Sequence, residues 1–171
     1  MSIENIRAGL TGSVDITVAE EHTAPHVGSG QVRVLATPVL VNLLEAAALK
    51  AMEHFVPAGH QTVGTLLNVK HLAATPVGMK VKAQAEVTRV AGRVLTFRVW
   101  ADDEVEPIGE GEHQRVIINL DKFDQRMGAK IVRRIPSVGR VPAARASSPG
   151  AATSSPARAA ASTPAHQAGP E

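Results

Sequence analysis

The apolar segment at residues 35–52 constrains the fold of this chain more than any other stretch. Thr37 is suited to cap the first amides of a helix, and Pro38 fits the first helical position because it has no N–H to lose. The segment is apolar on almost every face, which is typical of a helix in a protein interior. At about 16 residues it is too short to span a bilayer, which needs roughly 20. We therefore predict a long buried helix with one central carboxylate, Glu45.

Glu45 and Thr37 each allow a structural and a chemical interpretation. An unpaired charge is expensive to bury, so Glu45 needs an ion-pair partner, a proton or a catalytic role. Thr37 is explained as a helix cap without any chemistry. A hydroxyl at a helix N-terminus also lies in a positive local field, which helps to stabilise an oxyanion. The residues alone leave both alternatives open.

Alternation of apolar and polar residues predicts strands on both sides of the helix. The expected strands lie within residues 10–20, 61–71, 80–90, 94–101 and 107–120, and the polar residues 20–30 are expected to form a loop. One long buried helix wrapped by a curved antiparallel sheet is an α+β arrangement, the hot-dog pattern. Such a sheet would leave its edges and the helix flank exposed in a monomer, so we expect a homodimer or a higher oligomer.

Four further positions in the strands are candidate site residues. Strict alternation places His71 at the end of the apolar face of its strand and Gly64 on the opposite face. His71 is explained as a satisfied core histidine, and Gly64 as a bulge or as a close backbone approach to a ligand. His113 and Arg115 share one face of the last strand. They are explained as a solvated cross-strand pair, unless Arg115 holds a phosphate or orients a carboxylate.

The composition excludes several classes of protein. The chain has no cysteine, which excludes a disulfide scaffold, a thiolate zinc site and a cysteine nucleophile. Aromatic residues make up 2% of the chain, so platforms for stacking nucleic-acid bases are nearly absent. The scattered histidines lack ligand spacing, so we expect no metal and no cofactor. No signal peptide is visible, and we expect a cytoplasmic protein without nucleic-acid or membrane partners.

The chain is predicted to divide into a hot-dog domain at residues 1–128 and a tail at residues 129–171. From Pro136 onward, 36 residues hold six Pro and 11 Ala and no Leu, Ile or Phe. Such an Ala/Pro/Ser-rich segment cannot bury a core, so we predict that the tail is disordered.

Five sequence blocks, in order, resemble the fluoroacetyl-CoA thioesterase family of hot-dog proteins. They lie at residues 34–38, 44–47, 62–65, 71–78 and 108–115. The resemblance covers roughly residues 6–123 and excludes the tail. It implies a homodimeric hot-dog fold and hydrolysis of a short acyl-CoA, which would be the substrate.

The resemblance also implies roles for five residues. Thr37, Glu45 and His71 match the catalytic set, Gly64 matches the glycine at the acyl group, and Arg115 matches the arginine of the last strand. His71 would take a proton from Thr37 or from water while Glu45 orients the imidazole, or Glu45 would itself act as base or nucleophile. Thr37 and Glu45 lie about 12 Å apart along the helix axis. If they share one site, either His71 bridges them or the site is assembled across the dimer interface, and we expect the interface.

One departure from the family affects the expected substrate. The fluoroacetyl-specific member covers the acyl group with phenylalanines from the segment before the helix, whereas residues 20–34 here contain no aromatic Phe, Tyr or Trp. We therefore expect a general short-chain acyl-CoA thioesterase, with fluoroacetyl-CoA as one candidate substrate.

Two alternative functions remain. The first is a non-catalytic hot-dog protein that binds acyl-CoA or another small ligand, which would not need Thr37, Glu45 and His71 together. The second is a dehydratase of hydroxyacyl thioesters, which would not need Thr37.

Overall fold

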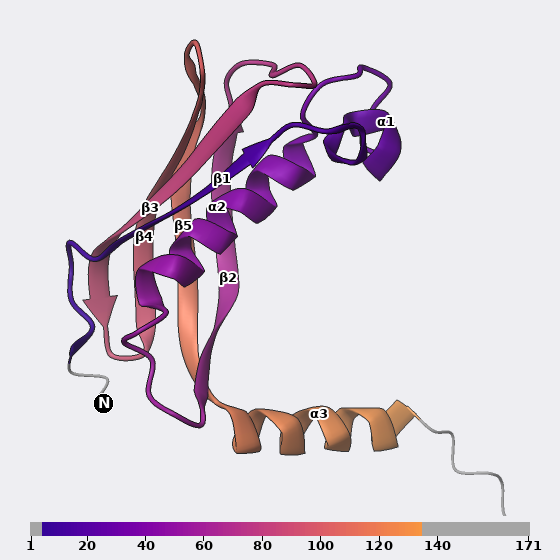
Figure 1. Ribbon diagram of the computed structural model, residues 1–171. Coiled ribbons are helices and arrows are strands. Elements are labelled where there is room, and N and C mark those ends of the chain that lie inside the picture. Colours follow the sequence, from indigo (N-terminus) through magenta and orange to yellow (C-terminus); the bar gives the residue numbers. More distant parts are fainter. Residues whose placement is uncertain (1–4, 135–171) are drawn as a thin grey trace, which may run out of the picture. The chain divides into compact units, whose positions relative to one another are not determined.

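The computed structural model describes residues 5–134, and in this part of the chain an antiparallel sheet of five strands curves around one long helix (Figure 1). The strands are β1 (Thr11–Thr17), β2 (His60–His71), β3 (Lys80–Ala91), β4 (Val94–Asp103) and β5 (Pro107–Asn119). The helical elements are η2 (Glu20–His22), α1 (Ala24–Val27), α2 (Thr37–Met52) and α3 (Leu120–Arg134). The sheet order is β1-β3-β4-β5-β2, which leaves β1 and β2 at the edges. The predicted α+β hot-dog class is confirmed.

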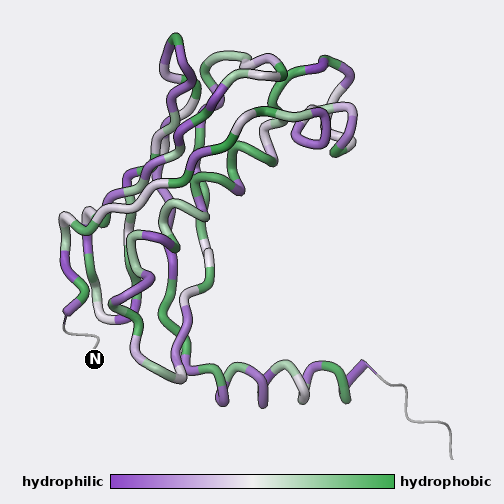
Figure 2. The backbone as a smooth tube through the Cα atoms, viewed as in Figure 1, coloured by the Kyte–Doolittle hydropathy of each residue, from purple (hydrophilic) through white to green (hydrophobic). Residues whose placement is uncertain are grey.

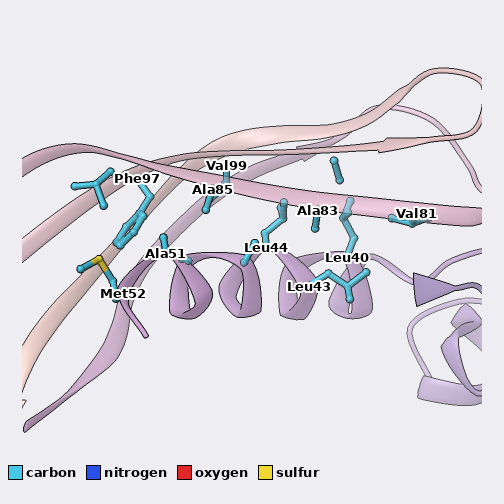
Figure 3. Packing of buried hydrophobic residues seen from close by; sticks show 14 of the residues in the cluster. Leu40, Leu43, Leu44, Ala51, Met52, Val81, Ala83, Ala85, Phe97 and Val99 are labelled. Atoms are coloured by element: carbon cyan, nitrogen blue, oxygen red, sulfur yellow. The ribbon is translucent and has the colours of Figure 1, made fainter. Parts of the chain in front are cut away.

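The core lies between one face of α2 and the inner face of the sheet. Leu40, Leu44, Ala47 and Ala48 on α2 are fully buried, and Figure 3 shows this face of the helix against alternate residues of β3 and β4. The sheet residues that meet the helix are Val81, Ala83, Ala85, Phe97 and Val99. Truncating a leucine in such a core typically costs about 2–5 kcal/mol of folding stability.

The opposite face of α2 is not covered by the sheet. Asn42 and Lys50 are exposed there, and Leu49 retains 43% of its accessible surface. The prediction that α2 is buried therefore holds for only one side of the helix within a single chain. A sheet can cover only one side of a helix, so burial of the apolar Leu49 needs another element.

A β-bulge in β2 changes which residues face α2. The pairing of β2 with β5 shifts register between Gly64 and Leu66, so Thr65 is an extra residue. Strict alternation would put Gly64 and His71 on opposite faces, and that expectation is wrong. The bulge reverses the alternation, so both residues point toward α2.

Two segments are more helical than the sequence indicated. The expected loop at residues 20–30 contains the short elements η2 and α1. The chain after β5 forms the 15-residue helix α3, which continues past residue 128, the expected end of the domain, to Arg134. Figure 2 shows hydrophobic and hydrophilic residues alternating along α3. The rest of the predicted tail lies outside the described residues.

Among the described residues, no helix combines the length and the apolar character needed to cross a membrane.

Candidate functional site

The first half of the candidate site is a hydrogen bond between the start of α2 and the end of β2. The Oγ1 atom of Thr37 lies 2.8 Å from the Nδ1 atom of His71. Thr37 does not cap the helix: the N-cap is Ala36, and no side chain bonds the first amides. The predicted capping role is therefore wrong, and the hydroxyl is directed to His71 instead. We call these two residues the Thr37–His71 pair.

A cavity of about 360 Å³ borders the Thr37–His71 pair. Its other walls come from the segment that precedes α2 and from the loop that follows β2. The residues that line these walls are mainly small or aliphatic: Ala24, Ser29, Val34, Leu35, Ala73 and Ala74. The cavity is therefore suited to a small apolar group beside a hydroxyl and an imidazole.

Burial keeps His71 in its neutral form. Desolvation lowers the pKa of His71 below its usual value, and the backbone of Ala73 partly opposes this by raising it. The Nε2 atom is buried and has no partner with hydrogen-bond geometry among the described residues. A neutral imidazole bonded to a hydroxyl is able to accept a proton from that hydroxyl or from a water molecule.

The second half of the site surrounds the carboxylate of Glu45, two turns further along α2. Its Oε1 atom lies 3.4 Å from Nη1 of Arg115 and 3.7 Å from Nε2 of His113. A Cβ atom added to Gly64 would overlap this same Oε1 atom. Gly64 therefore provides the space into which the Glu45 carboxylate fits.

Arg115 is the centre of this second half. Its Nε atom donates to Oγ1 of Thr62 at 2.9 Å, and its Nη2 atom donates to the Thr62 carbonyl at 3.0 Å. Its Nη1 atom lies 3.1 Å from Nε2 of His113. We call Glu45, Thr62, Gly64, His113 and Arg115 the Arg115 cluster.

His113 and Arg115 were not expected to be buried. These two residues were interpreted as a solvated cross-strand pair, but His113 is 0% exposed and Arg115 only 4% exposed. The signal was present, because both residues continue the alternation that ends at the core residue Ile117. Thr62 was not identified from the sequence, since its importance depends on the position of Arg115.

Within one chain, the structure does not bring the two halves together. Thr37 contacts His71, whereas Glu45 contacts Arg115 and His113. Eight residues of α2, or about 12 Å, separate Thr37 from Glu45. The five residues singled out from the sequence therefore form two local groups.

Known proteins are similar to this chain in both sequence and fold. Residues 18–121 match the family of fluoroacetyl-CoA-specific thioesterases. The fluoroacetyl-CoA thioesterase of Streptantibioticus cattleyicolor is 42% identical over 97 residues, which cover 57% of this chain and 70% of that protein. A solved structure of the fluoroacetyl-CoA thioesterase FlK has a TM-score of 0.69 at 36% identity, covering 77% of this chain and 99% of that chain.

A more distant structure agrees on the fold alone. The hot-dog-like protein from Thermanaerovibrio acidaminovorans has a TM-score of 0.69 at 23% identity, covering 74% of this chain and 94% of that chain. The matched residues 18–121 make up more than half of the present chain and contain Thr37, Glu45, Gly64, His71 and Arg115. The chain therefore belongs to the family of fluoroacetyl-CoA-specific thioesterases and has the hot-dog fold.

Proposed function

We propose that this protein hydrolyses short-chain acyl-CoA thioesters to the free acid and CoA. The observation that carries the proposal is the 2.8 Å hydrogen bond between Thr37 and His71 beside a small, mostly apolar cavity. A hydroxyl, a neutral imidazole and a space for an acyl group are the parts that thioester hydrolysis needs. The family match and the named relatives support the same reaction.

In the proposed reaction, His71 acts as the general base. A neutral imidazole carries its proton on one nitrogen only, and the proposal places it on Nε2. Nδ1 then accepts from the hydroxyl of Thr37. His71 draws the proton from Thr37 or from a water molecule as the oxygen attacks the thioester carbonyl. The C–S bond breaks, and the departing thiolate of CoA takes the proton from the His71 imidazolium. Attack by water gives the free acid directly, whereas attack by Thr37 leaves an acyl ester on its Oγ1 atom, which a water molecule activated by His71 then hydrolyses to the free acid.

Glu45 is proposed to join the reaction from the partner subunit. Its distance from Thr37 along α2 prevents direct contact within one chain. Across an interface, the carboxylate of the partner's Glu45 would orient water or the imidazole, or attack the thioester itself. Arg115 and Gly64 would hold this carboxylate beside the acyl group.

Two exposed surfaces support a homodimer. The edge strand β2 is 12 residues long and exposes Leu66 and Leu67, so it offers free backbone groups and apolar side chains to a second copy. The uncovered face of α2, with Leu49, offers a second apolar surface. Pairing two β2 edges would extend the sheet and set two α2 helices side by side.

Subunit mixing tests the shared site. Thr37→Ala and Glu45→Ala homodimers are each expected to be inactive. After 1:1 exchange, half of the dimers are mixed, and one of their two sites has both residues, so about one quarter of wild-type turnover should return. Exchange is verified by differently tagged subunits. No recovery after verified exchange would exclude a site shared between subunits.

Thiol release tests the reaction and its substrate. We expect release of CoA from acetyl-CoA, fluoroacetyl-CoA and other short acyl-CoA substrates, and turnover across a series of acyl chain lengths measures the preference. A protein that binds CoA ligands but releases no thiol from any of them would be a binding module instead. Water addition to an unsaturated acyl thioester would indicate a dehydratase. The cytoplasmic location expected from the sequence stays a prediction.

A further inference from the structure

His113 is a fully buried histidine that faces the proposed catalytic carboxylate. Its side chain is 0% exposed, and its Nε2 atom lies 3.7 Å from Oε1 of Glu45. The ring of Phe97 stacks on it, with a centroid distance of 5.9 Å and an interplanar angle of 30°. The reaction proposed above gives His113 no step, so its burial beside Glu45 needs another explanation.

Two hydrogen bonds determine which ring nitrogen of His113 carries the proton. Nδ1 lies 2.8 Å from the carbonyl oxygen of Leu66, and a carbonyl can only accept, so Nδ1 is the donor. Nε2 lies 3.1 Å from Nη1 of Arg115, which can only donate. The neutral imidazole with its proton on Nδ1 satisfies both contacts, and the charged imidazolium does not.

The contact with His113 fixes Nη1, the third nitrogen of the Arg115 guanidinium. Nε and Nη2 are held by the side chain and the carbonyl of Thr62. Nη1 is the atom that faces Glu45, and it is held by His113. His113 in turn is tied to Leu66, the residue that follows the bulge in β2. The bulge, the imidazole and the guanidinium thus form one chain of contacts that ends at the carboxylate.

We propose that His113 is a positioning residue of this site: as a neutral imidazole with its proton on Nδ1, it aims Nη1 of Arg115 and thereby fixes the carboxylate of Glu45. This role rests on the proposed thioester hydrolysis, because Glu45 is taken there as a reacting group. Protonation of His113 would convert Nε2 into a second donor facing Arg115. The guanidinium and the imidazolium would then repel each other, and Glu45 would lose its fixed partner.

The charged groups around His113 agree with a neutral ring. Glu45 from α2 and Arg115 from β5 are the ionisable groups that face it, while β4 contributes Phe97 and β2 contributes the carbonyl of Leu66. Burial lowers the pKa of His113, and the positive charge of Arg115 lowers it further. The Leu66 carbonyl and Glu45 act in the opposite direction.

Two matched substitutions separate positioning from packing. His113→Gln can place an amide oxygen near the former Nε2 and still accept from Arg115. His113→Asn can place an amide nitrogen near the former Nδ1, so it keeps the bond to Leu66 but offers Arg115 nothing. We expect His113→Asn to lower kcat by about 100-fold and His113→Gln by about tenfold or less, with little change in KM in either variant. Unfolding curves measured in parallel show how much stability each variant loses.

Equal losses of kcat in the two variants, or losses that follow only their stabilities, would overturn the positioning role. A second measurement uses the intact wild-type chain and does not depend on turnover. The ¹⁵N chemical shifts of the His113 ring should show the neutral form with the proton on Nδ1 at pH 7. A ring protonated on Nε2, or a charged ring, would overturn the proposal. If the wild-type protein hydrolyses no thioester, the proposed function fails, and the ¹⁵N shifts still decide the state of His113.

Discussion

The Thr37–His71 pair lies at the exposed start of α2, whereas the Arg115 cluster lies two turns further along, against the buried inner face of the sheet. In the cluster, Arg115 donates to Thr62, His113 and Glu45, and His113 also bonds Leu66. In the pair, one bond joins the two side chains, and Nε2 of His71 has no partner with hydrogen-bond geometry among the described residues.

This difference separates a half of the site whose polar groups hold one another in place from a half that keeps a ring nitrogen without a partner among the described residues. Groups whose hydrogen bonds are all made contribute to a fixed structure, and removing one leaves the others unpaired in the interior. A buried polar atom without a partner costs stability, and such costs are typical of functional positions. We therefore expect changes in the Arg115 cluster to affect folding strongly, and changes in the Thr37–His71 pair to affect turnover with little effect on folding.

The largest expected effect is on turnover, in the Thr37–His71 pair. His71→Leu should lower kcat/KM by about 10²- to 10⁴-fold, because a general base is lost. The same change removes the unpartnered Nε2, so the free energy of unfolding should stay unchanged or rise by about 1 kcal/mol. Thiol-release kinetics and urea unfolding measure the two effects. A loss of stability comparable to the loss of activity would show that the pair holds the fold together.

The next effect is on folding, in the Arg115 cluster. Arg115→Leu should lower the free energy of unfolding by about 3–5 kcal/mol, because Glu45 and Thr62 lose their buried partner. The matched control is Lys70→Leu, which removes the exposed ion pair with Glu110 and should change stability by less than about 1 kcal/mol. Urea unfolding at constant pH measures both. Similar losses for the two variants would show that the Arg115 cluster stabilises the fold no more than an exposed ion pair does.

A smaller effect is expected at Gly64. Gly64→Ala should lower the free energy of unfolding by about 1–3 kcal/mol and displace Glu45, because the new Cβ overlaps Oε1 and lies 3.2 Å from Cε1 of His113. Turnover should therefore fall as well. The control is Gly128→Ala in α3, where a Cβ meets no atom within 4 Å and the helix should be stabilised by about 0.5–1 kcal/mol. Full turnover in Gly64→Ala would mean that the position of Glu45 is unimportant.

The smallest effect is a dependence of stability on pH. Burial lowers the pKa of both His71 and His113 below the usual value of 6.5. As the pH falls below 6.5, the unfolded chain therefore binds protons that the folded chain does not, and stability decreases. The slope is at most about 1.4 kcal/mol per pH unit for each histidine. Unfolding curves between pH 7.5 and 5.5 should show this decline, and His71→Leu should make it shallower. A stability that rises toward pH 5.5 would contradict the neutral state of both rings.

Much of the fold could be predicted from the sequence, because each prediction depended on local patterns. The apolar run with Pro38 near its start indicated α2, and alternation indicated the five strands. The hot-dog arrangement followed from the order of these elements. The start of α2 was expected at Pro38 and lies one residue earlier, at Thr37, since a single boundary residue depends on its tertiary neighbours. The short helical elements at residues 20–27 were expected to be a loop.

The sequence by itself determined which side chains are available for chemistry: a hydroxyl at the start of α2, a carboxylate within it, a histidine at the end of β2 and an arginine in β5. Only the tertiary structure decided how they combine. The bulge at Thr65 turns Gly64 and His71 to the same face, and the long-range contact with His71 takes Thr37 away from helix capping. The alternation in β5 placed His113 and Arg115 on the inner face, but only the tertiary structure decided that Arg115 contacts Thr62 and Glu45 there. Such contacts join residues far apart in the chain, so no local pattern contains them.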